Sequence, residues 1–540
     1  MIVYNSFAQN FVWEMNFFHV DTTYNDSASA NAVAVDAFGN VYSTGFFVKA
    51  TDFDPGFGNF ILADSFGNPQ IYISKLDASG NFLWAKSMGR GSGGHSFLVV
   101  DNSNDLFLVE NNRWSGGIII SKVDPSGNIV WTKTIFAYLG YKSKPIAIDE
   151  FGNIYVSGFF SGTVDFDPGI GIANLTATAQ DVFLLKLDNL GSFIWVKQFS
   201  TGGAQGPSSV GVDSVGGIYL AGSFNGTTDF DPNAGVNNIS SSGLSDIFVT
   251  KLNLSGTFIW AKSIGGANTD VLTSIVIDKY ENIYSTGYFK GISDFNPGSG
   301  VNNLSSTIGS NDIFICKLDS SGNYKWAKSF SGVYDDYSYS LAVDINENVF
   351  TTGNYKGTVD FNPNAGVFNL SSLSSTNDIF VSKLDSAGNF VNALTFPGTG
   401  WESGFCITTD NYDNIFLTGD HVGGITDFDP GSGVYSVNAI QDAALFVLKL
   451  GNNVSAVNEM PNNLDNLAIY PNPANESINV VVNSKLVNSK YLIINALGQI
   501  ISSGKLPTEN TSINIDGLPT GIYLFQVGTL NQHSYRIVKK

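Results

Sequence analysis

The sequence has little of what disulfide-rich, zinc-binding and membrane-spanning proteins depend on. Among 540 residues there are two cysteines and four histidines, and only 14% of the residues are charged. Cys316 and Cys406 make neither a disulfide framework nor a CxxC metal motif, and the scattered histidines lack the spacing of zinc ligands. No apolar run approaches the ~20 residues that a membrane-spanning helix needs. We therefore expect no disulfide scaffold, no histidine-based zinc site and no transmembrane segment.

Positive charge is also scarce. The formal net charge is −20, from 27 Lys and Arg against 47 Asp and Glu. Nucleic acids and anionic membranes are bound through clustered basic residues, so neither is expected as a partner. The acidic surface is expected to keep the protein soluble, and the alternative is that it attracts cations or a basic partner.

Glycine and aromatic residues are abundant instead. The chain contains 58 Gly, 41 Phe and 22 Tyr, and no segment keeps the apolar spacing of an amphipathic helix. This composition is typical of short strands joined by tight turns. We therefore expect an all-β protein.

A repeated unit fills most of the chain. Each of seven units has an aspartate at the end of a short apolar segment: Asp36, Asp101, Asp149, Asp213, Asp278, Asp344 and Asp410. A full unit, from Ser274 to Phe330, contains four predicted strands of the types SIVID, NIYSTGYF, DIFICKLD and NYKWAKSF. Turns of the D-x-x-G-N type join the first two and the last two strands, and a DFDPG loop joins the middle two. Four short antiparallel strands per unit predict a propeller blade, which is stable only when stacked in a closed ring.

Two irregularities indicate how the ring closes. The seventh unit stops after its third strand at Leu450, while the segment Asn10–Trp13 matches the fourth-strand segment Asn81–Trp84. The sequence therefore predicts a seven-bladed β-propeller whose N-terminal strand completes the last blade and leaves no open edge. The second unit lacks the DFDPG loop, and we expect a blade there with one short connection.

These units resemble the secreted bacterial β-propeller repeat family over residues 10–450. The shared motifs are D-x-x-G-N-x-Y, T-G, K-L-D and G-N-x-x-W-A-K. The resemblance implies the propeller fold and no particular activity, because families of this kind have diverse functions.

The DFDPG loop is the predicted binding element. Carboxylate and amide oxygens are the ligands that Ca²⁺ prefers, so each loop is a candidate calcium site. The alternative is a structural turn, because Asx-Pro-Gly is a turn sequence and two such ligands are few for calcium. Loops that join equivalent strands should lie on one face and form a binding surface. The candidate ligands are Asp52, Asp54, Asp165, Asp167, Asp229, Asp231, Asp294, Asn296, Asp360, Asn362, Asp427 and Asp429.

Other repeated residues are expected to stabilise the scaffold. The tryptophans Trp84, Trp195, Trp260 and Trp326 are expected to pack between blades rather than to stack on carbohydrate. A lysine on each third strand is expected to pair with carboxylates across strands. We see no catalytic set, and the polar residues that we regard as departures from the repeat are Arg90, His95, Glu110, Arg113, Asp335, Asp336, Glu402 and His421.

The C-terminal part has a different character. Residues 451–466 are polar and Asn-rich, as in a linker, and residues 467–540 contain seven short predicted strands, which indicates an immunoglobulin-like β-sandwich. This segment resembles the C-terminal sorting domain of the type IX secretion system, which implies the type IX machinery as a partner and a Gram-negative host. The residues that carry the resemblance are Tyr470, Pro471, Asn472, Pro473, Gly498, Gly517, Gly521, Tyr523, Lys539 and Lys540.

The predicted organisation is a remnant of a signal peptide at residues 1–8, a propeller at 9–450, the linker and the sorting domain. We expect a monomer, secreted or at the outer-membrane surface, that acts as a binding or adhesion scaffold for a polysaccharide, a protein or a cation, with no cofactor other than possible Ca²⁺ and no catalytic activity. The alternatives are an extracellular polysaccharide-active enzyme with its site in the propeller channel and a purely structural surface protein.

Overall fold

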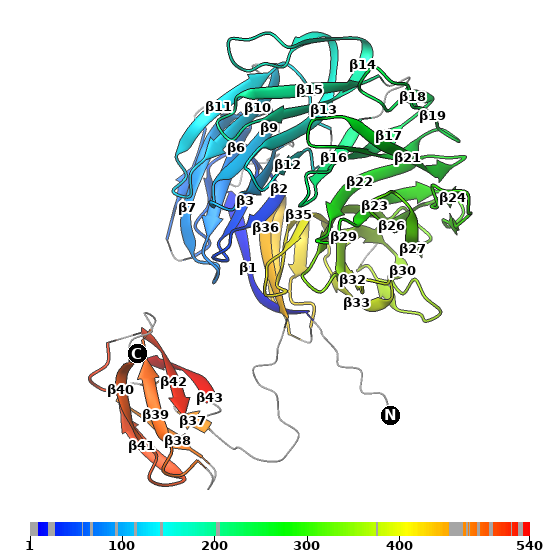
Figure 1. The fold of residues 1–540 in the computed structure, drawn as a ribbon. Helices are drawn as coiled ribbons and strands as arrows, with labels where there is room; N and C mark the ends of the chain where they lie inside the picture. The colour runs from blue at the N-terminus through cyan, green and yellow to red at the C-terminus, as the bar shows by residue number, and fades with distance from the viewer. Residues whose placement is uncertain are drawn as a thin grey trace. The chain divides into compact units, whose positions relative to one another are not determined.

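All regular elements of the structure, a computed structural model, are β-strands in the part of the chain that it describes. That part comprises residues 9–19, 28–56, 58–64, 68–91, 96–112, 116–140, 144–200, 206–373, 376–431, 433–452, 468–470, 474, 476–482, 486–495, 500–519, 521–527 and 533–539. The chain divides into two compact units, Met1–Asn453 and Val454–Lys540, and each is described by itself (Figure 1).

The first unit contains seven four-stranded antiparallel blades, one for each repeat. Blade 1 consists of β2 (Ser29–Val35), β3 (Val41–Phe47), β6 (Gln70–Leu76) and β7 (Phe82–Arg90). Blade 2 consists of β8 (Ser96–Val100), β9 (Leu106–Asn112), β10 (Gly117–Val123) and β11 (Ile129–Ile135). Blade 3 consists of β12 (Ile146–Ile148), β13 (Ile154–Asp165), β14 (Asn174–Leu187) and β15 (Phe193–Phe199). Blades 4 and 5 are formed by β16 (Pro207–Val212), β17 (Ile218–Phe224), β20 (Asp246–Leu252) and β21 (Phe258–Gly266); β22 (Asp270–Ile277), β23 (Ile283–Lys290), β26 (Asn311–Leu318) and β27 (Tyr324–Gly332). Blades 6 and 7 are formed by β28 (Tyr337–Val343), β29 (Val349–Lys356), β32 (Asn377–Leu384) and β33 (Phe390–Phe396); β34 (Trp401–Thr409), β35 (Ile415–Asp427), β36 (Ser436–Asn452) and β1 (Gln9–His19).

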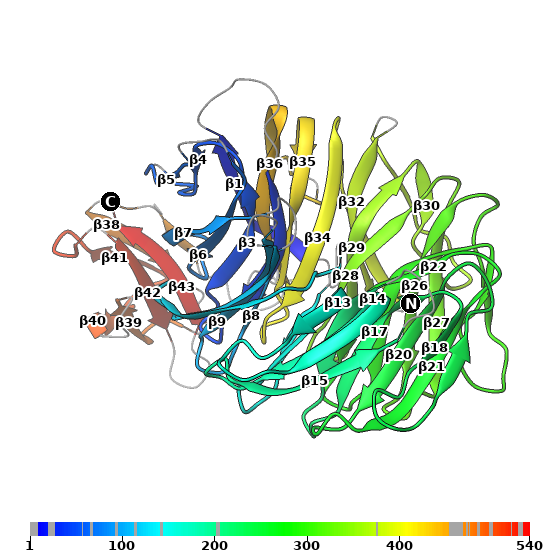
Figure 2. The same cartoon turned by 90° about the horizontal axis from the view of Figure 1, so that it is seen from above.

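The N-terminal strand closes the ring. Strand β1 pairs antiparallel with β36, with Glu14 opposite Leu448 and Phe17 opposite Leu445. The first strands of neighbouring blades contact one another all the way round, so they line the centre of the propeller (Figures 1 and 2). The predicted count of seven blades and the predicted closing strand are confirmed.

The DFDPG segments are β-hairpins rather than the loops expected from the sequence. The residues on each side of the tip pair with each other, as Asp294 does with Asn303. Three hairpins also pair with the fourth strand of the preceding blade, as Asp294 does with Gly265, and so join neighbouring blades. The separate hairpin strands are β4 (Thr51–Asp52), β5 (Ile61–Leu62), β18 (Thr227–Asp229), β19 (Asn238–Ser240), β24 (Ile292–Asp294), β25 (Asn303–Ser305), β30 (Thr358–Asp360) and β31 (Asn369–Ser371).

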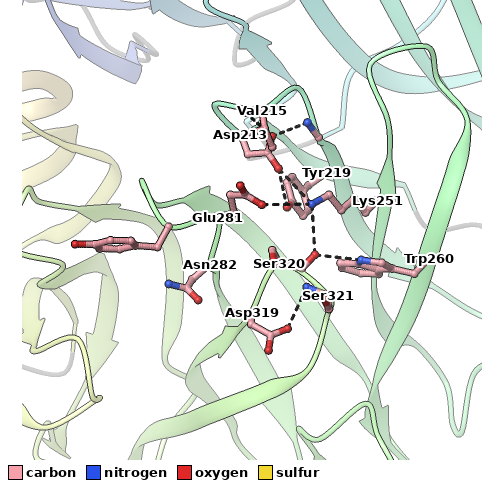
Figure 3. A network of polar contacts seen from close by, with 12 residues as sticks. Asp213, Val215, Tyr219, Lys251, Trp260, Glu281, Asn282, Asp319, Ser320 and Ser321 are labelled. Atoms are coloured by element: carbon pink, nitrogen blue, oxygen red, sulfur yellow. Dashed lines mark hydrogen bonds and ion pairs between the residues drawn. The ribbon is translucent and has the colours of Figure 1, made fainter.

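A polar network joins each blade to the next, as Figure 3 shows for blades 4 and 5. The Lys251 ammonium and the Trp260 indole N–H both donate to the backbone carbonyl of Ser320, at 3.4 and 3.3 Å. Lys251 also lies 3.3 Å from a carboxylate oxygen of Asp213. A Cβ on Gly322, in the same turn as Ser320, would come 3.2 Å from the Trp260 ring. The tryptophans therefore pack between blades, as predicted.

The lysine prediction holds in part. Lys122 and Lys186 pair with Asp105 and Asp149 of their own blades, at 2.9 and 3.8 Å. Lys75 and Lys449 instead donate to backbone carbonyls of the next blade, at 3.1 and 3.0 Å. Cys316 is buried and free.

The second unit consists of two sheets. Their strand orders are β37–β38–β41 and β40–β39–β42–β43, which is consistent with the predicted sandwich. Buried apolar side chains of both sheets, among them Ile478, Val480, Ile493 and Phe525, belong to one core. The strands are β37 (Ala468–Tyr470), β38 (Ser477–Val481), β39 (Lys490–Ile494), β40 (Ile500–Lys505), β41 (Asn510–Asn514), β42 (Gly521–Val527) and β43 (His533–Lys539).

Candidate functional site

The acidic residues of the DFDPG hairpins hold the hairpin tips in shape. In blade 3, Oδ1 of Asp165 accepts backbone N–H groups from Asp167 and Ala173, at 3.0 and 2.8 Å. Oδ1 of Asp167 accepts the N–H of Gly169 at 2.7 Å. The same three contacts recur in the other five hairpins. These contacts describe a turn in which both side chains of the pair have a structural role.

The calcium site therefore has two candidate ligands in each hairpin. Within the described ranges, no three His, Cys, Asp or Glu side chains come together in a way that could hold a metal ion. Coordination by calcium would need further oxygens, such as backbone carbonyls of the tip. Calcium binding at these hairpins stays a prediction.

His421, which the sequence appeared to set apart, occupies a position of the repeat. It packs edge-on against Phe428 of its own hairpin, with ring centroids 5.5 Å apart. The same contact is made by Phe160 with Phe166 and by Phe289 with Phe295 in other blades. Burial lowers the pKa of His421 to about 4, so the ring is neutral. An imidazole thus fills an aromatic position of the repeat, and His421 departs from the repeat in residue type but not in its place in the blade.

Glu402 is also a member of a repeated set. It is buried at the start of the seventh blade, where its Oε1 accepts the hydroxyl of Thr426 and the N–H of Gly400, both at 3.1 Å. Burial, and next the charge of Asp378, raise its pKa to about 8. Asp336 in blade 6 has the corresponding place, and burial raises its pKa to about 8, with Asp312 contributing. The sequence treated these two carboxyls as departures from the repeat, which was wrong.

The remaining polar residues that the sequence singled out are Arg90, His95, Glu110, Arg113 and Asp335. Glu110 is buried in blade 2, where burial raises its pKa to about 8. Asp335 is exposed and accepts the N–H of Asn311 at 2.8 Å. His95 and Arg113 lie outside the described residues.

A cavity lies on the face of the propeller that carries the D-x-x-G-N turns. Because strands alternate in direction, the first turns of all blades and the second turns of blades 1 to 6 share this face, and the hairpins lie on the other. The first turn of each blade follows the innermost strand, so these turns surround the centre. The cavity, of about 260 Å³, is lined by the first turns of blades 5, 6 and 7, through Val276, Ile277, Asp278, Lys279, Val343, Asp344, Ile345, Glu347, Thr409, Asp410 and Asn411.

The aspartates of the cavity are fixed by their own turns. Oδ1 of Asp278 accepts the N–H groups of Tyr280 and Asn282, and Oδ2 accepts the side-chain amide of Asn282, all at 2.8 Å. Asp344 and Asp410 make the equivalent bonds. With Glu347, whose carboxylate lies 3.9 Å from the Lys317 ammonium, they give the cavity lining four carboxylates and one ammonium, that of Lys279. The site thus carries negative charge that is held in place by the backbone.

Large apolar side chains project from the first turns into solvent. Five of the seven turns have one at the third position, and their exposure lies between 59% for Tyr280 and 78% for Tyr412; the others are Phe38, Phe151 and Val215. Sequence reasoning missed this feature. The signal was the contrast between D-x-F-G-N or D-x-Y-x-N in the first turn and D-S-S-G-N in the second.

The described residues of the sorting motifs stabilise the second unit. The hydroxyl of Tyr523 donates to the carbonyl of Pro519 at 2.8 Å, and Gly521 pairs with Lys539 at the edge of β42. Gly517 lies in the turn before β42, and Tyr470 ends β37 opposite Asn479. Pro471, Asn472, Pro473, Gly498 and Lys540 lie outside the described residues, as do the predicted signal-peptide remnant and residues 453–466 of the linker.

Comparison with known families identifies the C-terminal unit. Residues 468–540 match the family described as secretion system C-terminal sorting domain. The uncharacterized WD repeat-containing protein L264 of Acanthamoeba polyphaga mimivirus is 27% identical over an alignment of 334 residues that covers 51% of this chain and 24% of that protein. The chain thus matches about a quarter of the length of this curated relative.

Solved structures with some similarity have diverse functions. The polysaccharide lyase Uly1 is 8% identical, with a TM-score of 0.39 over 82% of this chain and 100% of that one. A mutant of the Synechocystis apocarotenoid oxygenase is 10% identical, with a TM-score of 0.37 over 82% and 98%. PorZ of Porphyromonas gingivalis, a surface component of the type-IX secretion system, is 11% identical, with a TM-score of 0.19 over 96% and 100%.

Proposed function

We propose that this chain, a β-propeller that ends in a secretion system C-terminal sorting domain, is a binding scaffold exported by the type IX secretion machinery. The sorting domain marks a secreted or cell-surface protein of a Gram-negative bacterium. None of the described residues forms a helix long and apolar enough to cross a membrane. The single observation that carries the proposal is that the sorting domain follows a rigid ring whose two faces present repeated turns and hairpins.

The repeated faces support a binding role. A rigid scaffold that presents loops at its ends is well suited to recognition, because little conformational entropy is lost on binding. The hairpin tips carry exposed apolar residues, such as Val236, Val301, Val367 and Val434, beside their aspartates. Side chains that are exposed at the same place in several blades have no packing role to explain them. They support contact with a partner outside the chain.

The alternative, a polysaccharide-active enzyme, requires carboxyls that reach a substrate. Glu402 and Asp336 have the raised pKa of a general acid, but both are fully buried. The carboxylates that line the cavity are instead engaged in their turns. These observations favour binding over catalysis.

Deleting residues 467–540 tests the export route. We expect the truncated chain to stay in the periplasm, while the full chain reaches the surface or the medium; fractionation followed by immunoblotting measures this. As a control, residues 467–540 fused to a periplasmic reporter should carry the reporter out of the cell. Normal surface display of the truncated chain would contradict the proposal.

A further inference from the structure

The first and second turns of each blade have the same conformation but different side chains at the third position. In both turns an Asx Oδ1 accepts the N–H groups two and four residues later, as Asp278 and Asp319 do. The third residues of the second turns are Ser79, Ser126, Leu190, Ser255, Ser321 and Ala387. The turn geometry therefore does not require an aromatic residue, and the exposure of Tyr280 and Tyr412 rules out a packing role.

Two of these exposed side chains adjoin the lining of the acidic cavity in the chain. Tyr280 and Tyr412 follow the cavity residues Lys279 and Asn411 directly in the chain, and Phe38 has the same position in the next blade round the ring. Aromatic faces beside carboxylates form a setting that suits an ammonium group, because the ring quadrupole and the negative charges both attract a cation. A cationic ligand is thus complementary to this part of the propeller.

Lys279 shows how an ammonium group lies there. Its Nζ is 5.1 Å from the centroid of the Tyr280 ring and donates to the carbonyl of Ile345, in the next blade, at 2.9 Å. At the equivalent places in blades 7 and 1 the chain has Asn411 and Ala37 instead of lysine. Tyr412 and Phe38 are still exposed in those turns. Two turns therefore keep the aromatic side chain without a lysine of their own.

Resting on the proposed binding function, we propose that the acidic cavity and the exposed side chains of the first turns around it bind a lysine-rich segment of a partner protein. A lysine side chain can lie along an exposed ring with its apolar stem while its ammonium reaches the carboxylates and turn carbonyls. An amino sugar has no such stem. The aspartate oxygens already accept bonds from their turns, so they act as fixed charges, and backbone carbonyls accept the new hydrogen bonds, as that of Ile345 does.

The test uses the full chain, a fluorescent deca-lysine peptide and anisotropy at about 0.15 M salt. We expect binding, and about a five- to tenfold loss of affinity in the double variant Tyr280→Ser, Tyr412→Ser, because two ring contacts are removed and the net charge is kept. Serine is already present at this position in the first turn of blade 2, as Ser103, so the variant should fold. Leu190→Ser, which changes an exposed residue of a second turn, is the matched control and should bind as the parent does.

Three outcomes would overturn the inference. The first is that deca-lysine does not bind. The second is that the tyrosine variant binds deca-lysine as tightly as the parent does, which would leave net charge as the only attraction. The third is that a glucosamine oligomer binds more tightly than deca-lysine, in a way that depends on the tyrosines. The Nε-acetylated peptide should not bind. The export experiment and the peptide experiment have independent outcomes. If the chain is exported but does not bind the peptide, this inference alone is contradicted.

Discussion

At the seam between two blades, one backbone carbonyl accepts hydrogen bonds from both a lysine and a tryptophan of the preceding blade. Ser320, Ser386, Pro125 and Ala78 each supply such a carbonyl. A buried or half-buried carbonyl with two donors leaves no lone pair unsatisfied. Two seams differ. The Trp131 indole N–H donates to the carbonyl of Asn189 without a lysine, and, as an exception among these tryptophans, the buried indole N–H of Trp195 has no partner.

This exception provides a matched pair of variants. Trp326→Phe removes ring volume and the 3.0 Å hydrogen bond to Ser386, whereas Trp195→Phe removes ring volume without a hydrogen bond. We expect Trp326→Phe to lower the free energy of unfolding by about 1 kcal/mol more than Trp195→Phe, as measured by urea denaturation. Equal losses would mean that the indole hydrogen bond contributes nothing at the seam.

At the scale of the turn, three carboxylate residues occupy backbone positions that favour glycine. Glu281, Glu347 and Asp413 have φ of 65°, 63° and 61°, where blades 1, 3 and 4 have glycine. Such a conformation costs about 1 kcal/mol for a residue with a Cβ. Glu281 and Glu347 lie 4.0 and 3.9 Å from Lys251 and Lys317 of the preceding blade. The strained turn thus brings a charge to the neighbouring blade.

The buried carboxyls make the stability depend on pH. In the folded protein the pKa of the Asp336 carboxyl is about 8, above its value of about 4 in the unfolded chain. The contribution of this group to the free energy of unfolding is therefore complete at low pH. That contribution is lost as pH rises from about 4 to about 8. We expect the Tm of the parent protein to fall by a few degrees from about pH 5 to pH 8, and Asp336→Asn to flatten this fall, measured by calorimetry. Asp335→Asn removes only a neighbouring charge that contributes to the raised pKa of Asp336, so it should flatten the slope less than Asp336→Asn does; a parent slope retained in Asp336→Asn would contradict the assignment.

The strands and turns could be predicted because their signals are local. Asp278 and Asn282 specify one turn by themselves, and the short apolar and aromatic run at the start of Ile313–Leu318 specifies one strand. The hairpin pairing of Asp294 with Asn303 was missed because Asx-Pro-Gly indicates a turn at the tip and says little about the flanking residues.

The exposed aromatic side chains of the first turns were missed for a different physical reason. Phe53 is buried beneath a hairpin tip and Phe38 is exposed in a turn, and residue type alone does not distinguish the two. The repeat position of Glu402 was hidden because blade 7 has a glutamate where blades 5 and 6 have Asp270 and Asp336. All three lie eight residues before the repeated aspartates Asp278, Asp344 and Asp410, so the alignment of the units already contained this correspondence.

At the scale of the whole molecule, the way in which the ring closes accounts for a change of residue type in blade 6. Each tryptophan of a fourth strand meets the second turn of the next blade, but blade 7 has no such turn, because β36 ends at Asn452 and β1 begins at Gln9. The tryptophan position of blade 6 is Asn392, which pairs with Lys383 as Trp326 pairs with Lys317. The residue and the topology change together at this one seam.

The closing strand also determines what the chain can do. An open seventh blade would expose a strand edge and the core beneath it, which favours aggregation rather than display at a surface. Because the two termini of the propeller meet in one blade, the binding faces form only when the whole ring has folded. The linker and the sorting domain come after this blade in the chain.

A disulfide between Met15→Cys and Val447→Cys tests the closure most directly. These residues are register partners of β1 and β36, and partners across antiparallel strands have Cα separations of about 4.5–5.5 Å, within the range that a disulfide accepts. We expect oxidation to cross-link the full chain, seen as a mobility shift without reductant and a bridged tryptic peptide by mass spectrometry. The slipped pair Met15→Cys and Phe446→Cys should cross-link poorly. Absence of the first cross-link, or equal yields from the two pairs, would contradict a ring closed by its N-terminal strand.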